Sequence, residues 1–242
     1  MISKNQIKTI ISLQQKKFRI ELNSFIVEGE KGIRELINSD FQLMHLYCTD
    51  GIFNDLKLNC FESISLADLK KISALSTPNN CLAVFKIPVF KPIINSDLIV
   101  VLDNIRDPGN LGTIIRLCDW FGVQQIVCSQ ETVDCFNPKV VQATMGSLTR
   151  VNINYTNLDE YLSKNNLPVY GTFMNGDNIY KTKLPNSGII IMGNEANGIS
   201  QILEKFIHNK LSIPKFGAFQ KTESLNVSTA TAIILSEFKR NV

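Results

Sequence analysis

The second half of the chain alternates short apolar runs with segments whose apolar residues recur at helical spacing. This pattern predicts strands at 98–103, 125–128, 168–173, 188–192 and 210–213 and helices at 110–121, 138–147, 157–164, 199–207 and 225–239. Parallel strands need long crossover connections, and helices are the usual ones. We therefore expect a mostly parallel α/β sheet with helices on both faces.

The first ninety residues carry a smaller α/β pattern. It predicts strands at 25–27, 44–48, 59–64 and 81–85 and helices at 2–17, 33–37 and 65–72. Two prolines interrupt the segment that follows, residues 86–96. Because about ninety residues can fold as a unit, we expect a domain at 1–90, a linker at 91–97 and a second domain at 98–242.

Composition narrows the class of protein. Hydrophobic residues make up 44% of the 242 residues and charged residues 19%, as in an ordinary folded domain rather than a disordered one. No apolar run approaches the roughly 20 residues that span a bilayer, and Met1–Lys4 lacks a secretory signal. We expect a cytoplasmic location.

The cysteine pattern also favours a cytoplasmic location. The six cysteines show neither Cys-x-x-Cys nor zinc-ligand spacing, which favours reduced core residues and no metal site. A pair between Cys128 and Cys135 is the alternative.

Positive charge is unevenly distributed. Residues 1–95 hold 12 Lys and Arg against 9 Asp and Glu, whereas 96–242 hold 13 of each, so the whole excess lies in the first part. The first twenty residues contain no acid and five basic residues: Lys4, Lys8, Lys16, Lys17 and Arg19. Such a stretch can contact phosphates, and the alternative is a solvated helix face.

One segment, residues 104–116 with the sequence NIRDPGNLGTIIR, joins a predicted buried strand to a predicted helix. Strand ends of this kind are where α/β proteins bind ligands. Pro108 and Gly109 favour a tight turn, and Gly112 allows close backbone approach. Asn110 can bond the loop backbone and cap the helix.

Arg116, one turn inside that helix, indicates an anionic or hydroxyl-bearing substrate. A surface arginine with no role is the alternative. A dinucleotide loop is disfavoured, because the G-x-G-x-x-G spacing is absent and no acid follows at the expected place.

Two further segments carry polar residues at element ends. In 189–198, IIIMGNEANG, Gly193 permits close approach of a ligand, and Glu195 can accept bonds from a hydroxyl or an arginine. The alternative for Glu195 is a helix-capping acid. Ser224 and Asn226 lie at the start of the last predicted helix, where an ordinary N-cap is the alternative.

Taken together, the ordered motifs N-x-x-D-P-x-N-x-G-x-x-x-R, G-N-E-x-x-G and I-P…S-L-N-V-S resemble the SpoU (TrmH-type) family of RNA ribose 2′-O-methyltransferases, within the SPOUT superfamily. The resemblance covers residues 98–242. The first ninety residues resemble, more loosely, an L30e-like RNA substrate-binding domain, best over residues 25–32, FIVEGEKG.

The resemblance implies a fold and a cofactor. It implies an α/β domain with a C-terminal trefoil knot, formed by about 188–200 and 210–230. The implied methyl donor is S-adenosylmethionine, and the residues that match its contacts are Thr172, Gly193, Ile213 and Leu225. It also implies a homodimer in which each active site is completed across the interface.

The resemblance also implies residue roles. Arg116 would orient the ribose 2′-hydroxyl and its phosphate, and Asn110 would shape the loop that positions Arg116. Glu195, Ser224 and Asn226 would orient the arginine, the ribose or the cofactor. The expected substrate is RNA, with 23S rRNA favoured. The alternatives are tRNA, a non-catalytic ribosome-assembly factor on the same fold and, more remotely, a nicotinamide-dependent oxidoreductase.

Overall fold

The computed structural model of the 242-residue chain describes residues 2–56, 59–95, 97–217 and 224–240. Packing divides the chain into two units, and each is described by itself. The first comprises Met1–Val89 with Asp134–Thr149, and the second Phe90–Val133 with Arg150–Val242. The segment Asp134–Thr149 thus packs with the N-terminal residues although it lies within the predicted second domain. The domain boundaries themselves stay a prediction.

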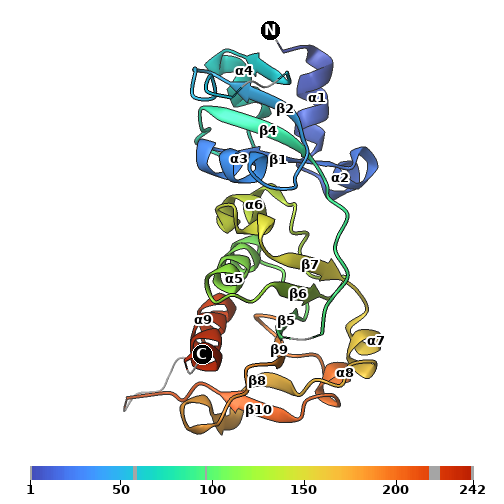
Figure 1. Cartoon of the computed structure of the whole chain (residues 1–242), viewed down its shortest axis with the longest axis vertical. Coiled ribbons are helices and arrows are strands. Elements are labelled where there is room, and N and C mark those ends of the chain that lie inside the picture. The colour runs from blue at the N-terminus through green and yellow to red at the C-terminus, as the bar shows by residue number, and fades with distance from the viewer. Residues whose placement is uncertain (1, 57–58, 96, 218–223, 241–242) are drawn as a thin grey trace. The chain divides into compact units, whose positions relative to one another are not determined.

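The first unit contains a four-stranded sheet (Figure 1). Its order is β1 (Ser24–Glu28), β4 (Cys81–Lys86), β2 (Leu43–Cys48) and β3 (Phe61–Ser63). β4 runs antiparallel to both neighbours, and β2 and β3 are parallel. Its helices are α1 (Lys4–Ser12), α2 (Lys16–Leu22), α3 (Glu30–Ile37), α4 (Leu66–Ile72) and α6 (Pro138–Thr144), with the 3-10 turn η1 (Ser147–Thr149).

The predicted helix at 2–17 is two helices in the structure. The chain turns after Ser12, and Leu13 enters the core with Ile10, Ile26 and Leu82. A helix end leaves carbonyl groups without partners. Here the carbonyl oxygens of Leu13 and Gln14 accept bonds from Arg19, a residue of the next helix. The periodicity of 2–17 could not reveal this break, because its partner lies outside that window.

The second unit contains a six-stranded, wholly parallel sheet. Its order is β10 (Asn209–Ser212), β8 (Val169–Asn178), β9 (Gly188–Met192), β5 (Leu98–Leu102), β6 (Gln125–Cys128) and β7 (Asn152–Tyr155). Its helices are α5 (Pro108–Trp120), α7 (Leu158–Ser163), α8 (Gln201–Glu204) and α9 (Val227–Lys239), with the 3-10 turn η2 (Ile179–Lys181).

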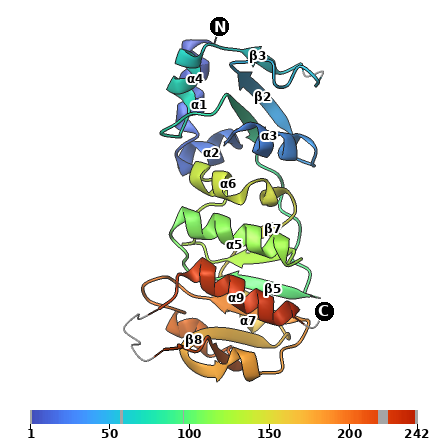
Figure 2. The same cartoon turned by 90° about the vertical axis from the view of Figure 1, so that its left-hand side faces the viewer.

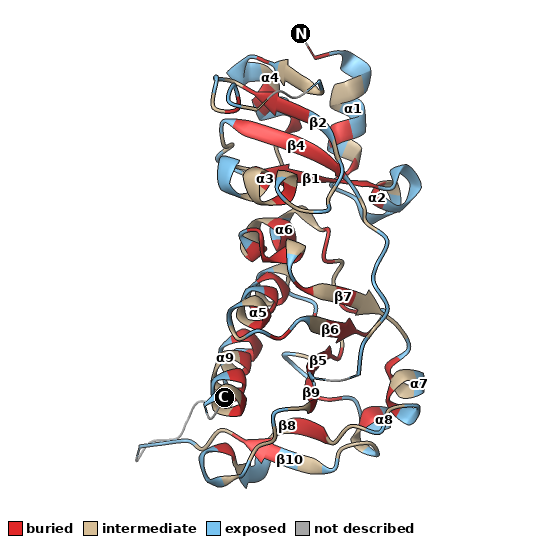
Figure 3. Cartoon of the chain, in the orientation of Figure 1, coloured by how far each residue is buried: buried red, intermediate tan, exposed pale blue. Residues whose placement is uncertain are grey.

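The helices of the second unit cover both faces of its sheet. α5 and α9 lie side by side on one face, and α7 packs with α8 on the other (Figures 1 and 2). The central strands β5 and β9 are buried along their whole length (Figure 3). The predicted α/β class with a mostly parallel sheet is confirmed.

Two elements of the second unit differ from expectation. β7 was not predicted, because the sequence Asn-Ile-Asn-Tyr buries only Ile153 and forms the edge of the sheet. α8 spans four residues rather than the expected nine. Its start is delayed because the backbone N–H of Ser200 donates to Asp103, at the end of β5, at 2.7 Å.

None of the six cysteines forms a disulfide, and five of them are buried. In the described part of the chain, no helix combines the length and hydropathy that crossing a bilayer requires.

Candidate active site

The loops that carry the polar motifs begin side by side. β5 and β9 are parallel neighbours, and Leu102 pairs with Met192 at their carboxyl ends. The residues that follow, 103–110 and 193–198, therefore leave the same edge of the sheet. α9 packs along α5, which brings its N-terminus to this edge. Segments far apart in sequence thus meet at one site.

α5 is capped by Asp107, not by Asn110. The carboxylate of Asp107 accepts the backbone N–H of Asn110 at 2.8 Å, and Pro108 occupies the first turn. The prediction that Asn110 caps this helix is therefore wrong. An Asp-Pro pair at a helix start is the sequence signal that identifies the cap. Because Asp107 caps the helix, the side chain of Asn110 is available for other hydrogen bonds.

Three of the predicted site residues form one hydrogen-bonded chain. Asn226 Nδ2 donates to Asn110 Oδ1 at 2.8 Å, and Asn110 Nδ2 donates to Glu195 Oε1 at 3.0 Å. Glu195 and Asn226 are separated from Asn110 by 85 and 116 positions in sequence. Tertiary structure therefore assembles the Asn226–Asn110–Glu195 network that the motifs predicted only as separate segments.

The direction of this network follows from the start of α9. Asn226 is the N-cap residue, and its Oδ1 accepts the backbone N–H groups of Ser228 and Thr229. Its amide nitrogen must then face Asn110, whose oxygen accepts. The remaining amide nitrogen of Asn110 can only donate, so it holds an acceptor, the carboxylate of Glu195. Helix capping thus orients a carboxylate on another loop.

The loop that carries Glu195 is a tight turn. Asn194 and Gly198 exchange backbone hydrogen bonds at 2.9 Å, and Asn194 Nδ2 donates to the carbonyl of Asn104 at 2.7 Å. A Cβ on Gly193 would lie 2.2 Å from the carbonyl carbon of Gly198, so only glycine fits there. Glu195 lies in this turn, before α8, and does not cap that helix.

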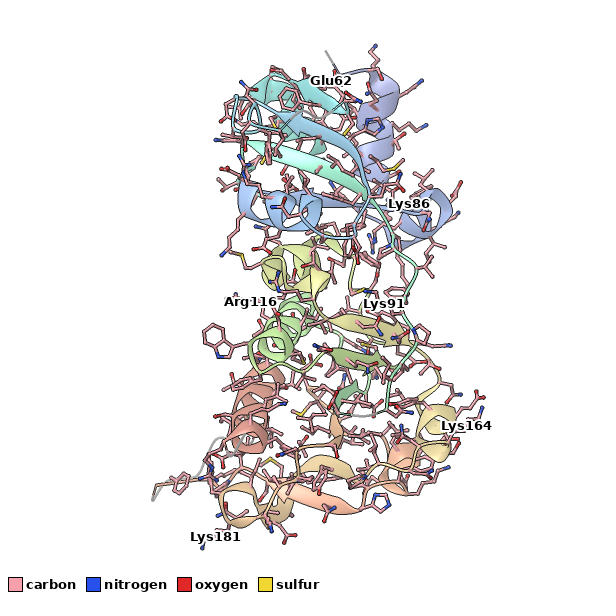
Figure 4. All side chains as sticks on the ribbon, viewed as in Figure 1. Glu62, Lys86, Lys91, Arg116, Lys164 and Lys181 are labelled. Carbon is pink, nitrogen blue, oxygen red and sulfur yellow. The ribbon has the colours of Figure 1, made fainter. Side chains whose placement is uncertain are left out.

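The structure leaves two predicted residues outside the network. Arg116 is exposed on α5 (Figure 4), and no residue in the described part of the chain forms a hydrogen bond or ion pair with it. Ser224 is likewise exposed, with no hydrogen bond to a described residue. Asn104 and Asn194, which hold the two loops together, were not predicted as site residues.

Of the residues predicted to hold the cofactor, Thr172 lies within β8, whereas Gly193 and Ile213 directly follow the neighbouring strands β9 and β10. The pairing of β8 with β9 ends at Gly171 and Ile191, whereas β10, on the other side of β8, pairs with it both before and after this point, at Gly171 and at Asp177. β8 and β9 therefore diverge at Thr172, whose hydroxyl donates to the carbonyl of Ile191 at 3.2 Å. Strand ends that diverge in this way leave backbone groups available to a ligand.

The other residues predicted to contact the cofactor suit its adenosine moiety. Gly193 follows β9 and Ile213 follows β10, and the side chain of Leu225 is 48% exposed. Backbone polar groups beside partly exposed apolar side chains are the donor set that an adenosine moiety requires. The residues present therefore fit S-adenosylmethionine. Residues 218–223 of the predicted loop lie outside the described residues.

The basic residues of the first unit fall into two kinds. Lys4, Lys8, Lys16 and Lys17 are exposed. Arg19 is 2% exposed, and its Nε and Nη2 donate to Asp134 Oδ2 at 2.9 and 2.6 Å. Arg19 is thus not available to a phosphate, and its prediction as an RNA contact is wrong. A charge count cannot separate a buried, paired arginine from exposed lysines.

A wholly parallel sheet with an asparagine–glutamate network and a glycine turn at its strand ends has the architecture of a SPOUT methyltransferase domain. The chain belongs to the SpoU rRNA Methylase family, whose model matches residues 97–236. Residues 4–83 match the MRM3-like substrate binding domain. The resemblance inferred from the motifs is confirmed.

Relatives and solved structures support this assignment over the whole chain. A 23S rRNA (guanosine(2553)-2′-O)-methyltransferase of Bacillus subtilis is 31% identical over 242 residues, covering 96% of each chain. A protein of Porphyromonas gingivalis, described as a TrmH-family RNA methyltransferase, superposes with a TM-score of 0.90 at 37% identity, covering 100% of both chains.

An rRNA methyltransferase of Sinorhizobium meliloti, solved with AdoMet bound, superposes with a TM-score of 0.88 at 27% identity. The match covers 100% of this chain and 97% of that one. The expectation of a methyltransferase that uses S-adenosylmethionine is confirmed at the level of the family.

Proposed function

We propose that this protein transfers a methyl group from S-adenosylmethionine to a ribose 2′-hydroxyl of 23S ribosomal RNA. The observations that carry the proposal are the Asn226–Asn110–Glu195 network and an exposed Arg116 on the same helix as Asn110. The Bacillus subtilis relative, similar over nearly its whole length, supports the ribosomal substrate.

The chemistry of methyl transfer explains why the reaction needs few protein side chains. A ribose hydroxyl is a weak nucleophile and must lose its proton as it attacks carbon. The cofactor, when bound, supplies an electrophilic methyl group on a sulfonium, which leaves as a neutral thioether. The protein must therefore position the hydroxyl and assist its deprotonation.

Arg116 is assigned to position the hydroxyl. Its guanidinium carries five N–H donors and remains protonated at neutral pH, so it orients the 2′-oxygen and the neighbouring phosphate rather than accepting the proton. Ser224 and Asn226 are assigned to orient the ribose or the cofactor. Glu195, held by Asn110, supplies an oriented carboxylate at the same loop edge.

We assign cofactor contacts to the diverging strand ends. Thr172, Gly193, Ile213 and Leu225 would hold the cofactor largely through backbone groups. In the same proposal the segments 188–200 and 210–230 form the family's knot, and the protein acts as a cytoplasmic homodimer. Arg116 has no partner among the described residues of its own chain, which supports a site completed by a second copy.

The N-terminal unit is assigned to RNA binding. The match to a substrate binding domain over residues 4–83 and the four exposed lysines support this role. Phosphate contacts by lysine make binding strongly dependent on salt.

Mapping 2′-O-methyl groups in total RNA from cells with and without the gene tests the proposal. A single 23S rRNA position that loses its methyl group on deletion, and regains it with purified protein and S-adenosylmethionine, is the expected result. Loss at a tRNA position would support the tRNA alternative. No change at any position would contradict methyl transfer and favour an RNA-binding assembly factor.

A further inference from the structure

One side chain on the helix of Arg116 packs against nothing in the described part of its own chain. Trp120, the only tryptophan of the chain, is the last residue of α5 and is 84% exposed. The core of this helix is made by Leu111, Ile114, Ile115 and Cys118, all fully buried. Among the described residues, none forms a hydrogen bond or ring contact with the indole.

Trp120 shares an exposed stripe with Arg116. Residues three and four positions apart lie on one helix face, and Gly109, Thr113, Arg116 and Trp120 follow this spacing and are all exposed. The Cβ atoms of Arg116 and Trp120 are therefore expected to lie about 5–6 Å apart. An exposed indole offers a partner roughly 200 Å² of largely apolar surface, and tryptophan is enriched at interfaces for this reason.

We propose that the indole of Trp120 stacks on a nucleobase of the RNA whose ribose is held by Arg116. This proposal rests on the proposed function and adds to it a contact with a base. RNA-binding proteins recognise single-stranded RNA by stacking unpaired bases on aromatic side chains and by binding the phosphates with arginine. The stripe presents both groups on one rigid helix.

The surroundings of the stripe fit a polyanion such as RNA. Arg150 lies beside the end of the helix, and its Nε donates to the carboxylate of Asp119 at 2.9–3.0 Å. This pair neutralises the acid next to Trp120, so Asp119 does not offset the positive charge of Arg116. A base on the indole and a phosphate on Arg116 would satisfy both side chains through one polynucleotide.

Because Trp120 is the only tryptophan, intrinsic tryptophan fluorescence reports on this position alone. The probe is a mixed-sequence single-stranded oligoribonucleotide of about twelve nucleotides, within the site sizes known for aromatic ssRNA platforms. Inorganic polyphosphate, an anion without bases, is the control. We expect the oligoribonucleotide to quench the fluorescence of the full chain and polyphosphate to leave it unchanged.

Steady-state methylation of unmodified 23S rRNA provides the second measurement. Base stacking on an aromatic residue is worth about 1–3 kcal/mol, so Trp120→Ala should raise KM for RNA about 5-fold or more, with kcat changed by less than about 2-fold. Trp120→Phe should restore most of the affinity. Ile202→Ala, which shortens a side chain 58% exposed on α8, should leave KM unchanged.

Two results would overturn the proposal. Unchanged KM together with no quenching by RNA, in an enzyme that methylates rRNA, would remove Trp120 from RNA binding and leave the proposed function intact. Dissociation of a dimer by Trp120→Ala in sedimentation, with no quenching by RNA, would assign the indole to a second copy of the chain. Quenching by RNA in a protein that methylates no RNA would support the stacking contact and reject methyl transfer.

Discussion

The two units each contain an arginine that the sequence singled out, and the structure treats them in opposite ways. Arg19 in the first unit is buried, pairs with Asp134 and bonds two backbone carbonyls. Arg116 in the second unit is exposed, with no partner in the part of the chain that the structure describes. The same side chain thus stabilises the fold in one unit and remains available to a ligand in the other.

The difference between the two arginines indicates where function can lie. A buried cation whose bonds are satisfied by the protein has none left for substrate. An exposed cation contributes little to stability, since the median exposed ion pair is worth about 0–1 kcal/mol. Arg116 therefore brings little benefit to the fold, as expected of a residue that acts on a substrate.

The largest expected effect concerns Arg116. Arg116→Ala should lower kcat for methyl transfer about 100-fold or more, because a misplaced nucleophile loses the benefit of positioning. The free energy of unfolding should change by less than about 0.5 kcal/mol, as for exposed substitutions elsewhere. Arg116→Lys, which keeps the charge but not the fork of donors, should recover only part of the rate.

Single-turnover assays and calorimetric titration with S-adenosylmethionine measure these effects. Cofactor affinity should match that of the unmodified enzyme. Full residual activity in Arg116→Ala would remove this residue from the site.

The next largest effect concerns Arg19. Arg19→Ala leaves the Asp134 carboxylate and two carbonyl groups without their partner, so the free energy of unfolding should fall by about 3–5 kcal/mol. Lys17→Ala, an exposed change in the same helix, is the matched control and should stay within about 0.5 kcal/mol. Urea denaturation followed by circular dichroism measures both. If Arg19→Ala cost less than Lys17→Ala, the buried pair would have no structural role.

The hydrogen-bonded network should respond to the chemistry of Asn110. Asn110→Ala removes the donor that orients Glu195, and about a 10- to 100-fold loss in kcat is expected from the misplaced loop. Asn110→Asp should be more harmful, because it places a second carboxylate against Glu195. Asn186→Ala, at an exposed asparagine of the same unit, should have normal activity. Equal activity in the Asp and Ala variants would mean that the carboxylate of Glu195 does not face Asn110 during turnover.

A smaller effect is expected from the exposed lysines. Replacing Lys8, Lys16 and Lys17 by alanine one at a time should weaken RNA binding. The slope of log affinity against log salt should become shallower by about 0.7–0.9 for each phosphate that is no longer neutralised. Lys164→Ala, at a lysine already paired with Glu160, is the control.

Fluorescence anisotropy measures RNA binding between about 50 and 200 mM salt, a range over which phosphate-dependent affinity changes strongly. Unaltered slopes in all three lysine variants would assign RNA binding to another surface.

The smallest expected effect is on the pH dependence of stability. The carboxylate of Glu28 in β1 accepts bonds from Ser73 Oγ and the N–H of Ala74, but burial raises its pKa above the usual value. The folded protein then holds this proton more tightly than the unfolded chain. The contribution of Glu28 to the free energy of unfolding is fully present below pH about 4.3 and is lost as pH rises through the raised pKa.

Glu28→Gln should remove this contribution, so that the free energy of unfolding varies less with pH in this window. Urea denaturation at several pH values measures the difference between the two proteins. An unchanged pH profile would show that the carboxyl titrates normally. Glu195, an exposed acid of the second unit, provides the comparison, since Glu195→Gln should alter activity.

Local pattern was enough for most elements of the chain. The strands at 125–128 and 188–192 match the structure residue for residue, because each is a short apolar run that is buried in the sheet. The edge strand β7 and the break between α1 and α2 were missed. In both cases the signal lies outside the segment itself, in the neighbouring strand β6 for β7 and in Arg19 of the following helix for the break.

The sequence by itself determined the α/β class, the family and the three polar segments of the site, because periodicity, turn chemistry and motif order are local properties. Only the tertiary structure decided that Arg19 is buried while its neighbouring lysines are exposed. It also decided that Asn110 joins Asn226 to Glu195. The physical reason is that burial and hydrogen-bond partners depend on residues far away in the chain, which no local pattern contains.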